Sequence, residues 1–281
     1  MENSNTGPGL FLATVLAITA TLGAAPPAYS ETFDNHPPRD DFAAALETDR
    51  PDISEASSTV GRHRFQLETS VAYSRDHDSG TTTHFYSAPT LLRFGISEPL
   101  EVRLESDMFA VQRESGMGTT HGLTDLAFGM KAHLTDGSGG IPSLGVLAHL
   151  GVPTGNDEFS ANGVEPELKI LADWDVVGDL ALGMNVGADI PVRDAAGDKF
   201  ARFLYSAAFS HPIPGLRDRW RVFVEAAGTV PAHADKPDTH IFNTGTALLI
   251  TPNLQLDAFA AVGLTAAAEG IQTGLGISWR R

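Results

Sequence analysis

Cysteine is absent from this 281-residue chain, and basic residues are scarce, with 19 Lys and Arg against 35 Asp and Glu. Without cysteine the chain forms neither a disulfide nor a thiolate metal site. The net charge of −16 argues against a nucleic-acid partner, because binding to a phosphate backbone requires a basic surface. The length is sufficient for one large β domain.

Long apolar runs are scarce as well. The run at residues 10–22 is shorter than the about 20 residues of a spanning helix, and no later run is as long, which argues against a helical membrane protein. Ala28-Tyr29-Ser30 fits a cleavage site before Glu31. No Lys or Arg precedes Arg39, although signal peptides usually begin with basic residues. We predict a secretory signal peptide over residues 1–30, with an uncleaved anchor as the alternative.

Residues 31–60 are rich in Asp, Glu, Ser and Pro. Such a composition buries too little apolar surface to form a core, so we expect an extended periplasmic lead-in rather than a domain. Pro51 and the charges around it fit a plug in a larger structure, and they fit a simple tether equally well.

From residue 65 onward, apolar side chains alternate with polar or small ones. The first example sets Phe65, Leu67, Thr69, Val71 and Tyr73 against polar or small neighbours. Successive side chains of a strand point to opposite faces, so each such segment has one apolar and one polar face. The pattern recurs about twelve times in segments of roughly ten residues. The longer polar connections that we expect between them are 75–83, 112–121, 155–164, 191–199 and 230–239.

This pattern predicts an all-β fold over residues 61–281, an antiparallel transmembrane up-and-down β-barrel of about 12 strands. The polar face is rich in Gly, Ala, Ser and Asn, whereas the wet face of a soluble sandwich would be rich in Lys and Glu. Lipid tolerates no open sheet edge, so the sheet must close. We therefore place the apolar face in the outer membrane of a Gram-negative-type cell and the polar face around a lumen. The aromatic residues that fit girdles at strand ends are Phe65, Tyr73, Trp174, Trp220 and Trp279.

Several stretches give the chain a family resemblance. They are "ETDRPDISEASSTVGRHRFQLET", "LLRFGISEPLEVRLE", "GLTDLAFGMKAHL", "GVPTGN", "VFVEAAG" and "LLITPNLQLDAFAAVGL". Together they resemble the MetA-pathway phenol-degradation family of outer-membrane transporters over roughly residues 47–281. The resemblance implies a porin-like barrel that passes small, often aromatic, molecules. Such barrels usually end on an aromatic residue that the outer-membrane assembly machinery reads, whereas here Trp279 precedes two arginines.

Charged residues on the predicted polar face are the candidate functional site, because a water-lined interior determines which solutes pass. A second interpretation is that these acids and bases pair across neighbouring strands and fill a narrow barrel. The candidates are Glu68, Arg93, Glu101, Arg103, Glu105, Lys131, Glu167, Lys169, Asp173, Arg221, Glu225 and Asp257.

Metal, cofactor and catalytic motifs are not evident. His77, His84, His121, His233 and His240 fall in or beside the expected long loops without ligand spacing, so we expect no metal site. The stretch "GMGTTHG" lacks the Lys and the helix of a phosphate loop. No Ser and His are distinguished as a catalytic pair, so we expect neither an enzyme nor a cofactor.

Three functions are compatible with a barrel of this kind. The first is a channel or transporter for passive movement of small organic solutes, aromatic ones among them. The second is a structural or adhesive barrel whose lumen is sealed by its charges. The third, with the least support, is a barrel hydrolase. The sequence does not name the solute or the oligomeric state.

Overall fold

The computed structural model describes residues 45–78, 80–193, 197–215 and 219–281. The predicted signal peptide and the first part of the lead-in lie outside these residues. The strands are β1 (Phe65–Asp78), β2 (Thr81–Ser87), β3 (Thr90–Ser97), β4 (Leu100–Ser106), β5 (Phe109–Glu114), β6 (Gly118–Leu123), β7 (Leu126–Thr135), β8 (Ser143–Val152), β9 (Glu165–Val177), β10 (Leu180–Arg193), β11 (Lys199–Pro212), β12 (Trp220–Pro231), β13 (Thr239–Thr251), β14 (Leu254–Gly263) and β15 (Ile271–Arg280). A short 3-10 helix, Asp157–Phe159, lies between β8 and β9.

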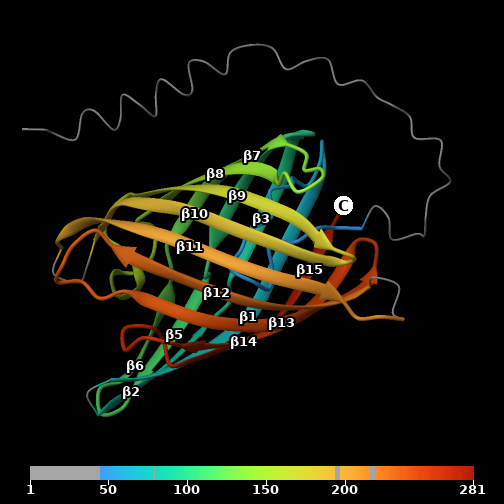
Figure 1. Ribbon diagram of the computed structural model, residues 1–281. Coiled ribbons are helices and arrows are strands. Elements are labelled where there is room, and N and C mark those ends of the chain that lie inside the picture. The colour runs from blue at the N-terminus through green and yellow to red at the C-terminus, as the bar shows by residue number, and fades with distance from the viewer. Residues whose placement is uncertain (1–44, 79, 194–196, 216–218) are drawn as a thin grey trace, which may run out of the picture. The chain divides into compact units, whose positions relative to one another are not determined.

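These strands form one antiparallel sheet that closes on itself through pairing of β1 with β15 (Figure 1). Strands β2 and β3 are consecutive pieces of one long strand, because both pair with β1. The same holds for β4 with β5 and for β6 with β7, which are separated by only two residues each. Counting each pair once gives a wall of 12 strands, which confirms the predicted barrel.

The two rims of the barrel differ. One rim carries turns of two residues after β3, β9 and β13. The other rim carries longer connections, including residues 153–164 between β8 and β9. Two of the predicted loops are wrong: most of 75–83 and 112–121 is strand, because β1, β2, β5 and β6 hydrogen-bond to one another beyond the rest of the wall. These four strands form the projecting sheet at the lower left of Figure 1.

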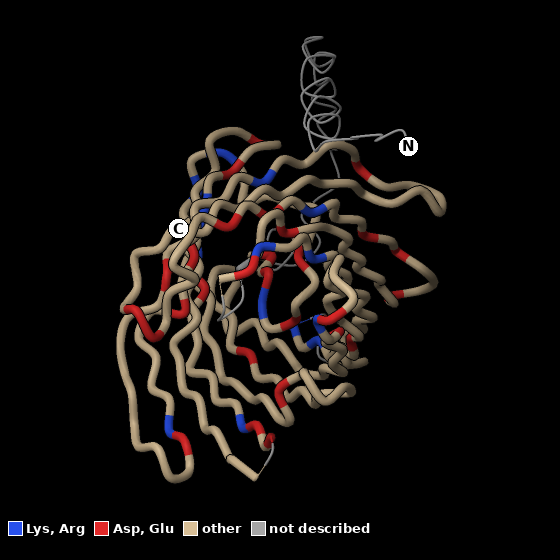
Figure 2. The backbone as a smooth tube through the Cα atoms, turned by 90° about the vertical axis from the view of Figure 1, so that its left-hand side faces the viewer, with Lys and Arg blue, Asp and Glu red and all other residues tan. Residues whose placement is uncertain are grey.

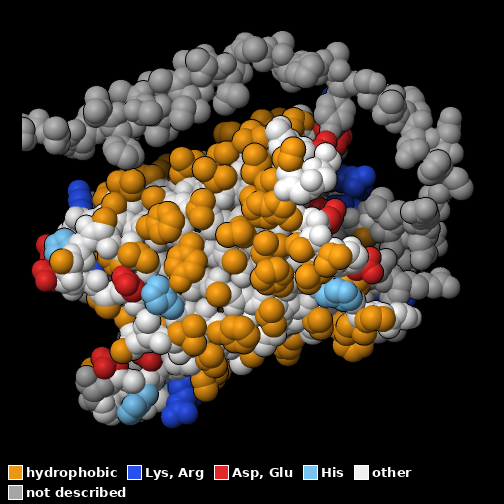
Figure 3. Space-filling view, viewed as in Figure 1, with side chains coloured by type: hydrophobic (Ala, Val, Ile, Leu, Met, Phe, Trp, Pro, Cys, Tyr) orange, Lys and Arg blue, Asp and Glu red, His pale blue; other side chains and the backbone are white. Residues whose placement is uncertain are grey.

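Burial in this barrel is the reverse of burial in a soluble protein. The largest fully buried side chains include Arg93, Lys131 and Glu101. Large apolar side chains such as Val71 and Leu275 face outward, with exposed fractions of 69% and 71%. Figure 3 shows such apolar side chains spread over the outer face of the wall. A surface of this kind is stable only in lipid, which places the barrel in a membrane.

Aromatic pairs occur near both ends of the outer face. Phe65 packs edge-on against Trp279, with ring centroids 6.4 Å apart, where β1 begins and β15 ends. Toward the other rim, the Tyr73 hydroxyl and His84 Nδ1 are 2.9 Å apart. His84 therefore lies on a strand of the wall and not in a loop. The described part of the chain contains no helix long and apolar enough to cross a membrane.

Candidate functional site: a lumen occupied by the chain

Residues 45–60, which we call the lumen loop, fold into the barrel. The Leu46 N–H donates to the Pro252 carbonyl at 2.8 Å, at the turn between β13 and β14. The Val60 N–H donates to Glu101 Oε2 of β4 at 2.8 Å. The loop thus enters and leaves at the rim with the short turns. Figure 2 shows acidic and basic positions gathered inside the ring of strands.

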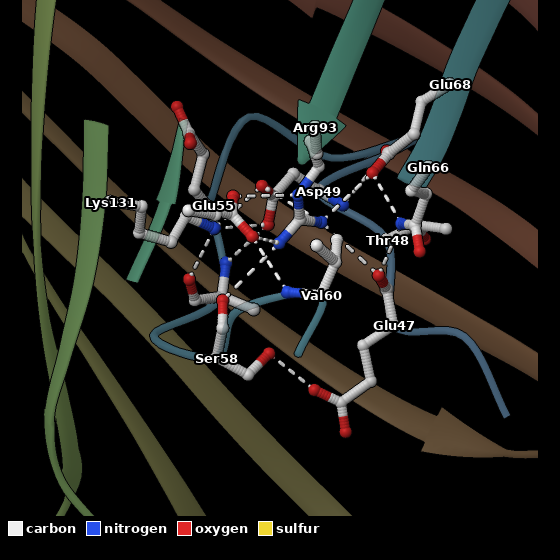
Figure 4. A network of polar contacts seen from close by, with 12 residues as sticks. Glu47, Thr48, Asp49, Glu55, Ser58, Val60, Gln66, Glu68, Arg93 and Lys131 are labelled. Carbon is white, nitrogen blue, oxygen red and sulfur yellow. Dashed lines mark hydrogen bonds and ion pairs between the residues drawn. The ribbon is translucent and has the colours of Figure 1, made fainter. Parts of the chain in front are cut away.

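Asp49 is the most highly connected carboxylate of the lumen loop (Figure 4). Its Oδ2 lies 2.7 Å from Lys131 Nζ, 3.1 Å from Arg103 Nη2 and 3.3 Å from Arg93 Nη1. These cations come from β7, β4 and β3, so one loop residue joins three strands. The Asp49 N–H also donates to Glu68 Oε2 at 3.0 Å.

Glu55 is the second anchor of the loop. Its carboxylate pairs with Arg103 and lies 3.4 Å from Lys169 Nζ on β9. Its backbone exchanges two hydrogen bonds with the Asn185 side chain on β10, at 2.6 and 2.9 Å. A buried backbone group without such a partner would be costly, so Asn185 fixes the position of this part of the loop.

On the opposite side of the wall, carboxylates that accept hydrogen bonds hold the loop. Glu225 on β12 accepts hydrogen bonds from the N–H groups of Ile53 at 2.9 Å and Ser54 at 2.7 Å. Asp257 on β14 pairs with Arg50 Nη2 at 3.3 Å. Asp173 on β9 accepts from the Ser57 N–H at 2.6 Å.

The wall also contains ion pairs of its own. Arg93 bonds Glu101 through Nε at 2.9 Å and Glu68 through Nη1 at 3.0 Å. Lys169 lies 2.9 Å from Glu167 Oε1. Glu68, Arg93 and Glu101 lie on β1, β3 and β4, which are neighbours in the sheet, so pairing across strands occurs as one interpretation anticipated.

Two predicted residues stand apart from this cluster. The Glu105 side chain is 47% exposed, and its carboxylate lies 3.7 Å from His149 Nε2. Arg221 donates to Ser210 Oγ at 3.1 Å. The contribution of the predicted residues to solute passage stays a prediction.

The sequence left open a plug at this segment but placed none of the loop residues among the candidate site residues. Asp49, Arg50 and Glu55 precede the first strand, and the alternating pattern does not extend to them. The available signal was the density of charges around Pro51 in "ETDRPDISE", which holds four acids and one Arg. Asn185 carries no charge, so a selection of charged residues on the polar face does not include it.

The loop carboxylates differ in acidity. Burial raises the pKa of Asp49, but Arg93, Lys131 and Arg103 outweigh it and leave the pKa below its ordinary value of 3.8. Burial likewise raises the pKa of Glu55, but Arg103 and Lys169 outweigh this effect, so the pKa lies well below its ordinary value of 4.5.

Asp52 is the exception. Burial together with the nearby Glu225 carboxylate raises its pKa well above the ordinary value of 3.8. Within the described residues it forms no ion pair with a cation.

The wall accommodates the loop closely at Gly145 on β8. A Cβ atom at this position would lie 2.9 Å from the Ser57 carbonyl oxygen and 3.0 Å from Ser57 Cα. Contacts this short to backbone atoms would force the loop to move, so the loop seats against the wall only because residue 145 lacks a side chain.

The loop does not fill the lumen. A cavity of about 580 Å³ lies toward the rim with the short turns and is lined by Arg219 and Leu249 among others. A second, of about 430 Å³, lies toward the opposite rim and is lined by Asp107 and Asp125 among others. Pockets of several hundred Å³ accommodate small organic molecules. No group of three or more potential metal ligands occurs among the described residues, and the absence of a metal site stays a prediction.

Comparison with known proteins agrees with this architecture. The family model described as "Putative MetA-pathway of phenol degradation" matches residues 48–281. An outer membrane channel from Pseudomonas putida F1 is similar with a TM-score of 0.63 and 14% identity, over 84% of this chain and 100% of that chain. The β domain of the Bordetella autotransporter BrkA gives 0.51 and 11%, over 77% and 99%. The NanC porin gives 0.50 and 12%, over 76% and 98%. No curated protein matches the chain.

Proposed function

This chain belongs to the family described as the MetA pathway of phenol degradation, and we propose that it is an outer-membrane channel for passive passage of small organic solutes, aromatic ones among them. The observation that carries the proposal is the pair of cavities beside the lumen loop. Both are lined by Arg50 and Asp52, so the two cavities adjoin the same part of the loop. A solute would pass beside this part, or through the space that the loop leaves when it is released.

The charged groups support a role in selection. Polar and charged side chains that line a lumen set which solutes are admitted. Of the candidates from the sequence, Glu68, Arg103, Glu105 and Lys169 line the second cavity, and Asp173 and Arg221 line the first. The loop adds Arg50, Asp52 and Glu55 to the second cavity. The proposal includes no catalytic or cofactor role. It includes the outer-membrane assembly machinery as a transient partner, because a barrel of this size must be inserted into the membrane.

The decisive experiment is single-channel recording of the refolded barrel in a planar bilayer, with aromatic acids as added solutes. We expect conductance steps that an aromatic acid blocks in a concentration-dependent manner. A correctly folded barrel that never conducts would overturn the proposal.

One observation favours a sealed structural or adhesive barrel as the second candidate. The Arg93 and Lys131 side chains are fully buried, and their pairs with Asp49 and Glu101 occlude part of the lumen. Substitution of Arg93 and Arg103 by Ala separates the two candidates. In a channel it changes conductance or ion selectivity, whereas in a sealed barrel it changes stability alone.

A further inference from the structure

The projecting sheet of β1, β2, β5 and β6 separates its charges by face. Even-numbered residues of β1, such as Ser74, point toward the lumen side, so odd-numbered ones point outward. Strand register carries this assignment across the sheet: Arg75 is opposite His84, and His84 is opposite Arg113. The outward row therefore reads Arg75, His84, Arg113.

The other face of the same sheet is acidic. Asp76 is opposite Thr83, and Thr83 is opposite Glu114, so these carboxylates lie on the lumen side. Within the described residues of this sheet, from Tyr73 on, the outward face carries no acid and the lumen face carries no base. The chain as a whole carries a net charge of −16, so an outward face without an acid has the opposite sign to the chain. In Figure 3 the projecting end at the lower left carries basic and His side chains as well as acidic ones.

The cationic row lies at the height of the membrane surface. Phe65 and Trp279 mark the lower aromatic girdle, and Arg75 follows Phe65 by ten residues along β1. At about 3.4 Å per residue and a tilt of about 40°, ten residues rise about 26 Å, which matches the roughly 25 Å apolar band of outer-membrane barrels. Tyr73 and Tyr86, with ring centroids 5.1 Å apart, lie directly below the row as an upper girdle.

The two guanidinium groups are available. Arg75 and Arg113 are both exposed, and neither forms an ion pair with a described residue. Arg113 lies over the Tyr86 ring at 5.9 Å, which orients it along the girdle. His84 lies between them and is half-buried. Arg is the side chain best suited to bind phosphate through paired hydrogen bonds.

We propose that Arg75, His84 and Arg113 form a docking surface for the phosphorylated headgroup of an outer-leaflet glycolipid. The row faces away from the lumen, continues the lipid-facing surface and carries the charge opposite to that of phosphate. The aromatic girdle directly below the row favours a lipid over a soluble anion, because a soluble anion would bind the charges alone. This surface is separate from the channel and does not depend on the proposed function.

Native mass spectrometry of the detergent-solubilised full barrel tests the proposal, with lipid A that carries two phosphates as the probe and dephosphorylated lipid A for comparison. We expect R75A/R113A to bind the phosphorylated probe at least tenfold more weakly, since each basic group near an anionic lipid surface contributes about 1 kcal/mol. The matched control is R62A/R64A, which removes the same charge from exposed positions at the opposite rim. It should bind as the wild type does.

Equal binding by wild type and R75A/R113A, or an equal loss in R62A/R64A, would overturn the proposal. A heat-induced shift on a gel verifies that each variant is folded. If the double variant does not fold, the single variants R75A and R113A, each with an expected loss of about fivefold, carry the test. R75K/R113K should retain a preference for the phosphorylated probe.

Discussion

At the scale of single residues, two carboxylates of the lumen loop have opposite electrostatic surroundings. Asp49 lies among Arg93, Arg103 and Lys131. Asp52, three positions later, lies near Glu225 and pairs with no cation among the described residues. Asp49 therefore stabilises the seated loop, whereas Asp52 destabilises the seated loop whenever its carboxylate is ionised.

Removal of the Asp49 charge should release the loop. D49N leaves three buried cations without their shared partner, and breaking a buried ion pair costs about 3–5 kcal/mol. This cost would shift the balance between seated and released loop by about 10²–10⁴-fold. Single-channel recording should show longer or larger openings than in the wild type. Unchanged openings would show that the Asp49 contacts do not hold the loop.

The same chemical change at Asp52 should act in the opposite direction. D52N removes a carboxylate whose ionisation is unfavourable in the seated state, so the loop should be held more firmly at neutral pH. We expect fewer openings than in the wild type and greater resistance of the loop to proteolysis. An increase in openings would contradict this assignment.

These two carboxylates predict a biphasic response to pH. The raised pKa of Asp52 means that its protonation favours the seated loop, so openings should decline as the pH falls from neutral toward 3.8. The lowered pKa values of Asp49 and Glu55 mean that their ion pairs persist above the ordinary values of 3.8 and 4.5. Those pairs are lost progressively below about pH 4, where openings should increase again. Single-channel recordings across this pH range test both the decline and the increase in openings. D52N should abolish only the decline between neutral pH and 3.8.

At the scale of elements, strand periodicity and loop placement differ in how far they follow from sequence. Alternation identified β10 and β15 and the inward positions of Glu68 and Arg93, because a strand has a fixed period of two. The lumen loop has no period. Its path depends on partners such as Lys131 and Glu225, which lie 82 and 171–172 residues away along the chain.

The fit between loop and wall can be tested at one strand. G145A on β8 places a Cβ 2.9 Å from the Ser57 carbonyl and should unseat the loop, which single-channel recording would detect as increased opening. Gly151, on the same face of β8, offers the control, since a Cβ there meets its nearest atom at an ordinary 3.5 Å. G151A should therefore conduct as the wild type does. Equal effects of both variants would point to damage to β8 rather than to the loop.

At the scale of the whole molecule, the surroundings of the barrel determine which substitutions it tolerates. Ile277 on β15 is opposite Thr69, near the middle of the apolar band, whereas Ile271 is opposite Arg75 at its upper edge. I277R should destabilise the barrel in lipid vesicles by about 2–4 kcal/mol, and I271R by about 0–1 kcal/mol. Denaturant unfolding in vesicles measures both. Equal costs at the two sites would contradict the assigned position of the membrane.

The closure of the wall has a consequence for the order of folding. The pairing of β1 with β15 joins Gln66 to Arg280, so the last strand to be synthesised is required before the ring exists. The lumen loop is synthesised earlier, and in the folded barrel it contacts strands from β3 to β14. Contacts so distant along the chain form slowly. If the lumen loop binds several strands before β1 pairs with β15, it holds them together while the ring closes. Deletion of the loop should therefore slow refolding even where the finished barrel is stable.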